Sequence, residues 1–351
     1  MPCLSAGDKL FHSFASGCGE KNVRILAKKI MQRRTVLEHL LLGAGGLMLL
    51  PGCTASKEVA AARERAIGVQ LFTIPGLVDQ DFSGTLKLLG DIGYREVETF
   101  GPYPFSAEVA KEQWAGMKPM LGLKNDAFYG YSSAETARMM KDNGLSVPSA
   151  HTDLITLRTG MTKLLDGLAP LEPQYVVLPA LSDVKDRANL DAYRRLAEEF
   201  NGFGEQMASY GMQFVYHNHG YEHIVMDGQQ PLDFLLDNTE EDKVAFELDM
   251  FWMKAAGAEP ISYLKKYPGR FKMLHIKDAS EPFRFAGDGS TPDQWMAGFA
   301  KMADPGTGVL DVAEIVATAA VNGTEHFFLE RDLAPEPTET LRNSFTQLKG
   351  M

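Results

Sequence analysis

Cysteine is scarce in this chain of 351 residues, which contains only Cys3, Cys18 and Cys53. All three lie in the first sixth of the sequence, so residues 54–351 offer no thiol. A disulfide-stabilised fold is therefore excluded for that part of the chain, and so is a zinc or iron–sulfur site with cysteine ligands.

The chain also lacks an excess of positive charge. It has 35 Lys and Arg against 46 Asp and Glu, a formal net charge of −11. Residues 1–52 carry seven basic and three acidic side chains, which leaves 28 and 43, or −15, for residues 53–351. Proteins that bind nucleic acid neutralise phosphates with a basic surface, so DNA and RNA are poor partners. The hydrophobic fraction of 45% is typical of a globular protein.

Nucleotide-binding loops are a third absence. No Gly-x-Gly-x-x-Gly follows the first predicted strand, and the chain has no phosphate-loop motif. The segment that comes nearest to a phosphate-binding loop is Asp304-Pro-Gly-Thr-Gly308, which equally well leads into a helix that begins near Leu310. The sequence therefore gives little support for a nucleotide cofactor or a phosphorylated substrate.

The first part of the chain carries two motifs of bacterial export. Met31-Gln-Arg-Arg-Thr-Val-Leu37 resembles a twin-arginine signal. An apolar run over residues 40–50, short for a transmembrane helix, leads to Leu50-Pro-Gly-Cys53, which resembles a lipobox. A buried apolar helix that ends near a cysteine by chance is the alternative interpretation.

These resemblances imply a lipoprotein exported to the periplasm. Residues 1–30 would precede the true start, and residues 31–52 would form the signal peptide. Residues 53–66 would be a tether that begins with a lipidated Cys53. Thr54 follows this cysteine in place of aspartate, which favours the outer membrane of a Gram-negative bacterium. The membrane is then a partner only through this lipid anchor.

Residues 67–351 alternate between apolar or β-branched segments and amphipathic ones. The eight predicted strands are Ile67–Ile74, Glu96–Phe100, Val147–His151, Tyr175–Leu181, Gln213–His219, Val244–Trp252, Phe271–Lys277 and His326–Arg331. The predicted helices are Gly84–Ile92, Ala107–Leu121, Ala134–Asn143, Met161–Leu168, Leu190–Tyr210, Pro231–Leu236, Pro260–Tyr267, Leu310–Ala320 and Glu339–Leu348. Eight such units in about 280 residues predict an α/β fold of the (β/α)₈ TIM-barrel type. A doubly wound open sheet is the alternative.

Ionisable side chains stand at the ends of six predicted strands. The C-terminal ends of barrel strands face the active site, so these side chains are expected to converge. They are Glu98, His151, His217 with His219, Asp249, His275 and Glu330. Carboxylates and imidazoles suit Mn²⁺, Mg²⁺, Co²⁺ or Zn²⁺, and the sequence does not select among these ions.

Four motifs over residues 67–350 resemble the xylose-isomerase-like barrels, which include sugar isomerases and epimerases, inosose dehydratases and endonuclease IV-type enzymes. The motifs are Tyr216-His-Asn-His-Gly-Tyr-Glu222, Glu247-Leu-Asp-Met-Phe-Trp252, Leu274-His-Ile-Lys-Asp278 and Leu329-Glu-Arg331. The resemblance implies a divalent metal held by Asp249, His275 and Glu330. Many members supply a glutamate from strand five, where this chain has His217. His217 is therefore the predicted fourth ligand, and the alternative is that His219 or Glu222 reaches the metal from the loop.

The resemblance also implies a reaction in which a base removes a proton next to a sugar carbonyl, through an enediolate that the metal stabilises. His219 or Glu222 is then the predicted base. His151 is a predicted substrate contact or proton donor, and Glu330 is assigned to catalysis as well as to the metal. The predicted substrate-binding residues are Glu98, Tyr221, Trp252, Lys277 and Arg331. Core filling by Trp252, and an ion pair of Lys277 with Asp278 or Asp249, are equally consistent with the sequence.

The sequence leaves several functions open. The first is a sugar isomerase or epimerase acting on an unphosphorylated sugar. The second is a lyase, hydrolase or dehydratase that eliminates a β-substituent, for example from a 3-keto-glycoside. An endonuclease conflicts with the negative charge, and a sugar-binding lipoprotein without catalysis is an alternative of another class. A homo-oligomer is compatible with this fold, but no segment specifies an interface.

Overall fold

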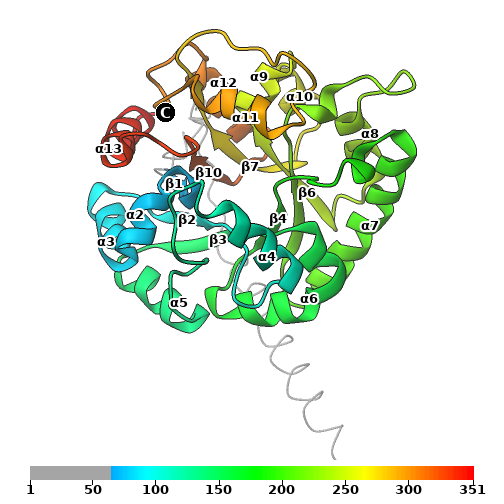
Figure 1. Ribbon diagram of the computed structural model, residues 1–351. Helices are drawn as coiled ribbons and strands as arrows, with labels where there is room; N and C mark the ends of the chain where they lie inside the picture. Colours follow the sequence, from blue (N-terminus) through cyan, green and yellow to red (C-terminus); the bar gives the residue numbers. More distant parts are fainter. Residues whose placement is uncertain (1–64) are drawn as a thin grey trace, which may run out of the picture. The chain divides into compact units, whose positions relative to one another are not determined.

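The computed structural model describes residues 65–351, in which eight parallel strands close into a barrel in the order β1-β10-β7-β6-β5-β4-β3-β2 (Figure 1). The strands are β1 Gly68–Gln70, β2 Glu96–Thr99, β3 Ser146–His151, β4 Tyr175–Leu178, β5 Gln213–His217, β6 Val244–Asp249, β7 Phe271–Ile276 and β10 His326–Leu329. The predicted TIM barrel is confirmed, and each strand lies within one residue of its predicted start.

Helices form a ring outside the barrel (Figure 1). The α-helices are α2 Pro75–Gln80, α3 Phe82–Ile92, α4 Glu108–Met117, α5 Ser133–Asp142, α6 Leu154–Leu168, α7 Leu190–Ala208, α8 Pro231–Asn238, α9 Met250–Ala255, α10 Pro260–Lys266, α11 Pro292–Phe299, α12 Val312–Val321 and α13 Pro337–Leu348. Short 3₁₀ turns are η1 Leu71–Thr73, η2 Ala169–Leu171, η3 Val184–Arg187 and η4 Tyr221–His223. Within residues 65–351, none of the helices combines the length and apolar character needed to cross a bilayer.

The end of β6 differs from its prediction. The expected strand ran to Trp252, but β6 stops at Asp249 and α9 begins at the next residue. Asp249 is the N-cap of α9, because its Oδ1 accepts the N–H groups of Phe251 and Trp252, each at 2.9 Å. This cap turns an apolar run that resembles a long strand into a strand followed by a helix.

Besides α9, two helices and one small ladder were not predicted. The short α2 and α11 each begin with proline in the first turn and are shorter than typical helices. The antiparallel ladder pairs β8, Asp278–Ala279, with β9, Met302–Ala303. This ladder closes the base of the long segment between β7 and α12, which carries α11.

Inward-facing side chains change character along the strands. The lower layer of the barrel interior is apolar and consists of Tyr175, Val177, Val215, Ala245, Met273 and Phe328. Side chains alternate along a strand, so the residues two positions further also face inward. On β5, β6 and β7 these residues are His217, Glu247 and His275, which are all buried. An ionisable layer therefore lies directly above an apolar one, at the C-terminal mouth.

The predicted upstream extension, the signal peptide and Cys53 lie outside the described residues, as does nearly all of the tether. Export and lipidation therefore stay predictions.

Candidate metal centre at the mouth of the barrel

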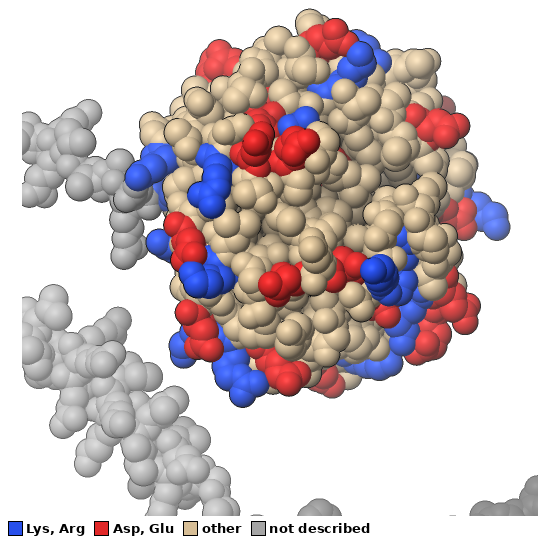
Figure 2. All heavy atoms as spheres, turned by 60° about the vertical axis from the view of Figure 1, so that its left-hand side comes forward, with Lys and Arg blue, Asp and Glu red and all other residues tan. Residues whose placement is uncertain are grey.

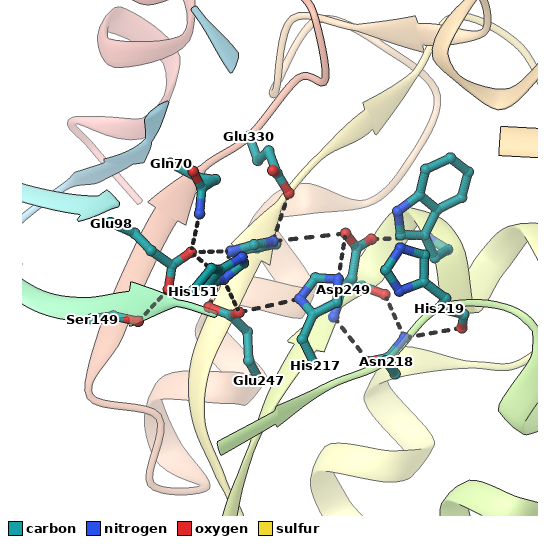
Figure 3. Close-up of polar contacts among 12 residues, drawn as sticks. Gln70, Glu98, Ser149, His151, His217, Asn218, His219, Glu247, Asp249 and Glu330 are labelled. Carbon is teal, nitrogen blue, oxygen red and sulfur yellow. Dashed lines mark hydrogen bonds and ion pairs between the residues drawn. The ribbon is translucent and has the colours of Figure 1, made fainter. Parts of the chain in front are cut away.

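Seven ionisable side chains from six strands converge at the C-terminal mouth (Figure 3). None is more than 6% exposed, and four are fully buried. They are Glu98, His151, His217, Glu247, Asp249, His275 and Glu330. Their donor atoms form two groups, in each of which all ligand atoms lie within 4.8 Å of one another.

The first group consists of Asp249, His275 and Glu330. Glu330 Oε2 lies 2.6 Å from His275 Nδ1, and Asp249 Oδ2 lies 3.8 Å from the same nitrogen. Asp249 Oδ2 and His275 Nδ1 are buried and make no hydrogen bond. The structure thus brings together the three side chains that the sequence placed around a metal.

The second group consists of His151, His217, Glu247 and His275. Glu247 Oε2 lies 3.1 Å from both His151 Nε2 and His217 Nδ1. Its Oε1 lies 3.1 Å from His275 Nε2 but makes no hydrogen bond. His217, the predicted fourth ligand of the first group, thus lies with the second, although its Nε2 is 3.7 Å from Asp249 Oδ2.

Glu98 borders the second group rather than an open substrate site. It is fully buried, and its Oε1 lies 2.9 Å from His151 Nε2 and 2.6 Å from His275 Nε2. Gln70 and Ser149 also donate hydrogen bonds to its carboxylate. Because these neighbours surround both oxygens, Glu98 is not free to contact a sugar directly.

The donors present fit a divalent cation. Buried imidazole nitrogens and carboxylate oxygens are the ligand types of Zn²⁺, Co²⁺ and Mn²⁺. Glu247 Oε1 is buried and makes no hydrogen bond, and a buried carboxylate oxygen without a positive partner is costly. Asn218 fixes the Asp249 backbone by accepting its N–H at 3.0 Å, a supporting contact typical of metal sites.

The electrostatics of the mouth favour positive charge. Burial raises the pKa of Glu247, but His275, His151 and His217 outweigh that effect and hold the pKa well below its ordinary value. Burial lowers the pKa of His151, but Glu98 and Glu247 outweigh it and raise the pKa to about 9. The carboxylates therefore stay ionised. They stabilise positive charge beside them, either as protons on the neighbouring imidazoles or as metal ions.

Lys277 neutralises part of this negative charge. Its Nζ lies 2.9 Å from both Asp249 Oδ2 and Glu330 Oε2 and also pairs with Asp332. The ion pair with Asp249 was one of the interpretations open from the sequence; Asp278 is not a partner. Asp332 was not predicted, and burial raises the pKa of its carboxyl to about 7.

Glu222 does not face the cluster, although the sequence offered it as a base. Its carboxylate accepts hydrogen bonds from the Tyr216 hydroxyl and, at 3.0 Å, from the His219 N–H. Tyr216 precedes the inward-facing His217, so its side chain points out of the barrel. Glu222 therefore lies behind β5 and holds the turn that carries His219.

Replacing Glu222 by glutamine is expected to flatten the pH dependence of stability. Burial raises the pKa of Glu222 to about 7, above its value in an unfolded chain, although the Tyr216 hydroxyl opposes the shift. The native state then binds the extra proton, so the free energy of unfolding falls as pH rises from about 4.5 to 7. Glutamine does not titrate, so the free energy of unfolding of Glu222→Gln, relative to that of wild type, should rise by about 3 kcal/mol between pH 5 and pH 8.

Urea unfolding of both proteins at these two pH values measures this difference. Glu112→Gln, at an exposed position of α4, is the control, and its free energy of unfolding should depend on pH in the same way as that of wild type. If the free energy of unfolding of Glu222→Gln changed between these pH values as much as that of wild type, the raised pKa of Glu222 would be contradicted.

Three residues predicted to contact the substrate make other contacts within the protein instead. Arg331 lies away from the cluster, because its guanidinium pairs with Asp304 at 2.6 Å. Trp252 is 2% exposed and stacks on Phe285, with ring centroids 5.6 Å apart. Tyr221 is also buried, and its hydroxyl accepts the Leu181 N–H.

Trp295 on α11 is an aromatic residue that the sequence reasoning missed. It is partly exposed, and its ring centroid lies 5.3 Å from that of His219. The ring of His219 lies in turn 5.1 Å from that of His217. No local pattern near Trp295 indicates this position, since the long segment after β7 brings it there.

The loop at 304–308 holds a carboxylate of the protein itself. The N–H groups of Gly306 and Gly308 donate to Asp278 Oδ2 at 3.0 and 2.8 Å, and that of Leu310 donates to Oδ1 at 3.0 Å. These amides are therefore not free to bind a phosphate group. The loop instead fixes the segment that follows β7.

Surface charge on the face shown in Figure 2 is mixed, with lysine and arginine scattered among acidic side chains. That face offers no broad basic patch for a phosphate backbone.

Comparison with known proteins agrees with this architecture. Residues 86–345 match the family described as the xylose isomerase-like TIM barrel. An inosose dehydratase of Clostridium perfringens is 33% identical over 96 residues, 27% of this chain and 32% of that protein. One from Lacticaseibacillus casei is 29% identical over 99 residues, 28% of this chain and 33% of that protein. The matched segment thus spans about a third of the length of these relatives.

Solved structures share the fold. A sugar phosphate isomerase/epimerase from Parabacteroides distasonis aligns with a TM-score of 0.64 and 24% identity, over 85% of this chain and 98% of that one. The protein IolI, which has a bound zinc atom, aligns with a TM-score of 0.58 and 15% identity, over 81% and 95%. With a closed eight-stranded barrel and a family match over most of its described residues, this chain belongs to the xylose isomerase-like TIM-barrel family.

Proposed function

We propose that the protein is a divalent-metal-dependent enzyme that removes a proton from the carbon beside a carbonyl of an unphosphorylated sugar, and thereby isomerises or epimerises it. The observation that carries the proposal is the group of Asp249, His275 and Glu330 at the mouth of the barrel. Its atoms Asp249 Oδ2 and His275 Nδ1 are buried and make no hydrogen bond, and the single charge of Lys277 balances only part of the charge of the two carboxylates.

Asp249, His275 and Glu330 would hold the metal. A bound divalent ion supplies a Lewis acid that polarises the carbonyl and hydroxyl oxygens of a sugar. Lys277 offsets the remaining charge of the two carboxylates from 2.9 Å. Three protein ligands leave coordination positions for a substrate, as catalytic sites of this type require.

His219 is the base in this proposal. Burial, together with the neighbouring His217, lowers the pKa of His219 well below its ordinary value, so its imidazole is neutral at pH 7. Its Nδ1 makes no hydrogen bond, and Glu222 fixes its backbone N–H. A neutral, positioned imidazole can accept a proton from carbon. His151 is less suited to acid catalysis, since its Nε2 lies between Glu98 and Glu247.

Two features support an unphosphorylated substrate. The amides of the 304–308 loop already bind Asp278. Arg331, which stands next to Glu330 in sequence, is paired with Asp304. Neither group is free to bind a phosphate, which is a dianion that proteins hold with amides and arginine.

Elimination is the second candidate, because the relatives from Clostridium perfringens and Lacticaseibacillus casei are inosose dehydratases. It shares the first step, after which a leaving group on the next carbon departs and the proton is not returned. A single free base suits this outcome, or isomerisation on one face, better than epimerisation with a base on each face. Dehydration and the cleavage of a 3-keto-glycoside are two forms of this elimination.

Hydrogen exchange in D₂O tests the proposal. The purified full-length chain, kept in detergent and loaded with Mn²⁺, is incubated with free ketoses, ketose phosphates, inososes and 3-keto-glucosides and followed by proton NMR. Deuterium beside the carbonyl of an intact free sugar is the expected result. Loss of that proton together with a released leaving group would make the protein a lyase. A metal-loaded protein that exchanges no substrate would overturn both and favour a binding role.

The His219→Gln variant sharpens this test. Removing a general base is expected to slow exchange by about 10²- to 10⁴-fold while the metal stays bound. His223→Gln is the matched control, because His223 is another buried histidine of the same turn whose ring contacts Tyr263. Equal rates for His219→Gln and the control would remove His219 from the proposed role.

A further inference from the structure

The long segment between β7 and α12 reaches across one side of the barrel mouth. It packs on α9, which follows β6, and it contacts the loops after β5 and β4. The contact with the β4 loop is made by Arg187 of η3, whose guanidinium donates to Ser290 O at 3.0 Å and to Leu181 O at 2.9 Å. The segment therefore forms a wall of the mouth on the side of β4, β5 and β6.

Phe285 holds this wall against the turn that carries His219. Its ring stacks on Trp252, with the two centroids 5.6 Å apart and the planes 15° from parallel. Gly220 and Gly289 make room for the ring, because a Cβ atom at either position would collide with it. The glycine that follows His219 in sequence therefore lets the segment approach the proposed base closely.

Trp295 of α11 is the aromatic ring that the segment places beside His219. Its Nε1 donates to Gly289 O at 2.7 Å, which fixes the orientation of the indole. The Trp295 and His219 rings have their centroids 5.3 Å apart, and both side chains are partly exposed. Met296, the next residue of α11, is 51% exposed. An indole that is fixed in one orientation and open to solvent can bind another ring with little loss of side-chain freedom.

The charge of the segment indicates what kind of group would lie there. Residues 285–300 include two acidic side chains, Asp288 and Asp293, but no lysine or arginine. The polar side chains nearest in sequence to Trp295 are already paired, since Gln294 Oε1 accepts the Ser290 N–H at 2.9 Å and Asp288 Oδ1 accepts the Ser290 hydroxyl at 2.6 Å. An anionic group would find no counter-charge on this segment, so a neutral, apolar group fits best.

We propose that the substrate is a sugar with an aromatic substituent, and that Trp295 binds the substituent while the sugar lies beside His219. This inference rests on the proposed function, because it takes His219 as the base. The ring centroids of His217, His219 and Trp295 follow one another at 5.1 and 5.3 Å. The second ring of a substrate whose sugar lies beside His219 therefore falls at Trp295. Isomerisation and elimination share this arrangement, since both begin with the same proton removal.

Calorimetric binding of unreactive glycosides tests the inference without turnover. The probes are phenyl and methyl β-glucoside, β-galactoside and β-xyloside, which have no carbonyl group. The full-length chain is kept in a detergent without a sugar head group. For at least one sugar, wild type should bind the phenyl glycoside about tenfold more tightly than the methyl glycoside. Trp295→Ala should bind the two equally, and Trp295→Phe, which keeps a ring, should retain part of the preference.

Tyr210→Ala is the matched control, because it also removes a partly exposed ring. Tyr210 follows α7, is 38% exposed, and donates its hydroxyl to Asp166 at 3.0 Å. A helix of this barrel runs back from the mouth, so the end of α7 lies at the opposite face. Tyr210→Ala should therefore keep the full preference of wild type for the phenyl glycoside.

The comparison within wild type does not depend on the folding of any variant. Equal affinity for every phenyl and methyl pair, or no binding of any phenyl glycoside, would overturn the inference. A preference that persists in folded Trp295→Ala would overturn it as well. Exchange into a free sugar in D₂O without a phenyl preference would leave the proposed function intact. A preference that depends on Trp295, without exchange of any substrate, would overturn that function alone.

Discussion

Replacing Glu330 by glutamine is expected to lower kcat/KM by about 10³-fold and to release the metal of the first group. The change keeps the side-chain volume but removes a charge. An amide is a weaker ligand than a carboxylate, and its NH₂ would face Lys277 Nζ, which now lies 2.9 Å from Glu330 Oε2. Initial rates with the substrate found by exchange, measured alongside metal content, test this expectation.

Glu325→Gln is the matched control for Glu330→Gln. Glu325 precedes β10 by one residue, and its carboxylate pairs with Lys272 at 2.8 Å and with the Tyr175 hydroxyl at 3.1 Å. These contacts lie at the opposite end of the barrel, so kcat/KM should change less than about twofold. A Glu330→Gln variant that keeps its metal and a tenth of its activity would show that Glu330 is not a ligand.

Removing the metal is expected to abolish turnover and to lower Tm by about 5–10 °C. A ligand present at 1,000 times its Kd stabilises the native state by about 4 kcal/mol, which in a domain of this size corresponds to that range. The physical cause is the buried charge of Glu98, Glu247, Asp249 and Glu330, which protons on the imidazoles only partly offset once the metal leaves. Thermal unfolding with and without a chelator measures the change.

The effect should be reversible and should depend on pH. Adding back Mn²⁺ or Zn²⁺ should restore Tm and activity together. Metal binding displaces the proton of His275, whose pKa burial lowers but Glu247 and Glu330 raise well above its ordinary value, so the stabilisation by metal should shrink as pH falls. The Glu330→Gln variant should lose less Tm on chelation than wild type. A wild-type Tm that chelator shifts by less than about 1 °C would argue against a metal in the folded protein.

The local sequence pattern was sufficient to predict the barrel and most of the residues at its mouth. Each strand is a short apolar run, and its last inward residue is polar because it faces the site rather than the core. Asp249, His275 and Glu330 are visible for this reason, since an ionisable group at the end of a buried strand has few structural explanations. Glu247 could have been found in the same way, because it stands two residues before Asp249 and so shares its face.

The sequence alone determined the eight-unit barrel, the scarcity of basic charge and the ionisable ends of the strands, because these depend on residue type and on periods of two and 3.6. Only the tertiary structure decided where loop side chains point. In the folded protein Glu222 lies behind β5, Arg331 pairs with Asp304, and the amides of the 304–308 loop bind the carboxylate of Asp278. It also brought two donor groups around His275 from strands far apart in sequence. Such choices depend on contacts between distant segments, and no local period encodes them.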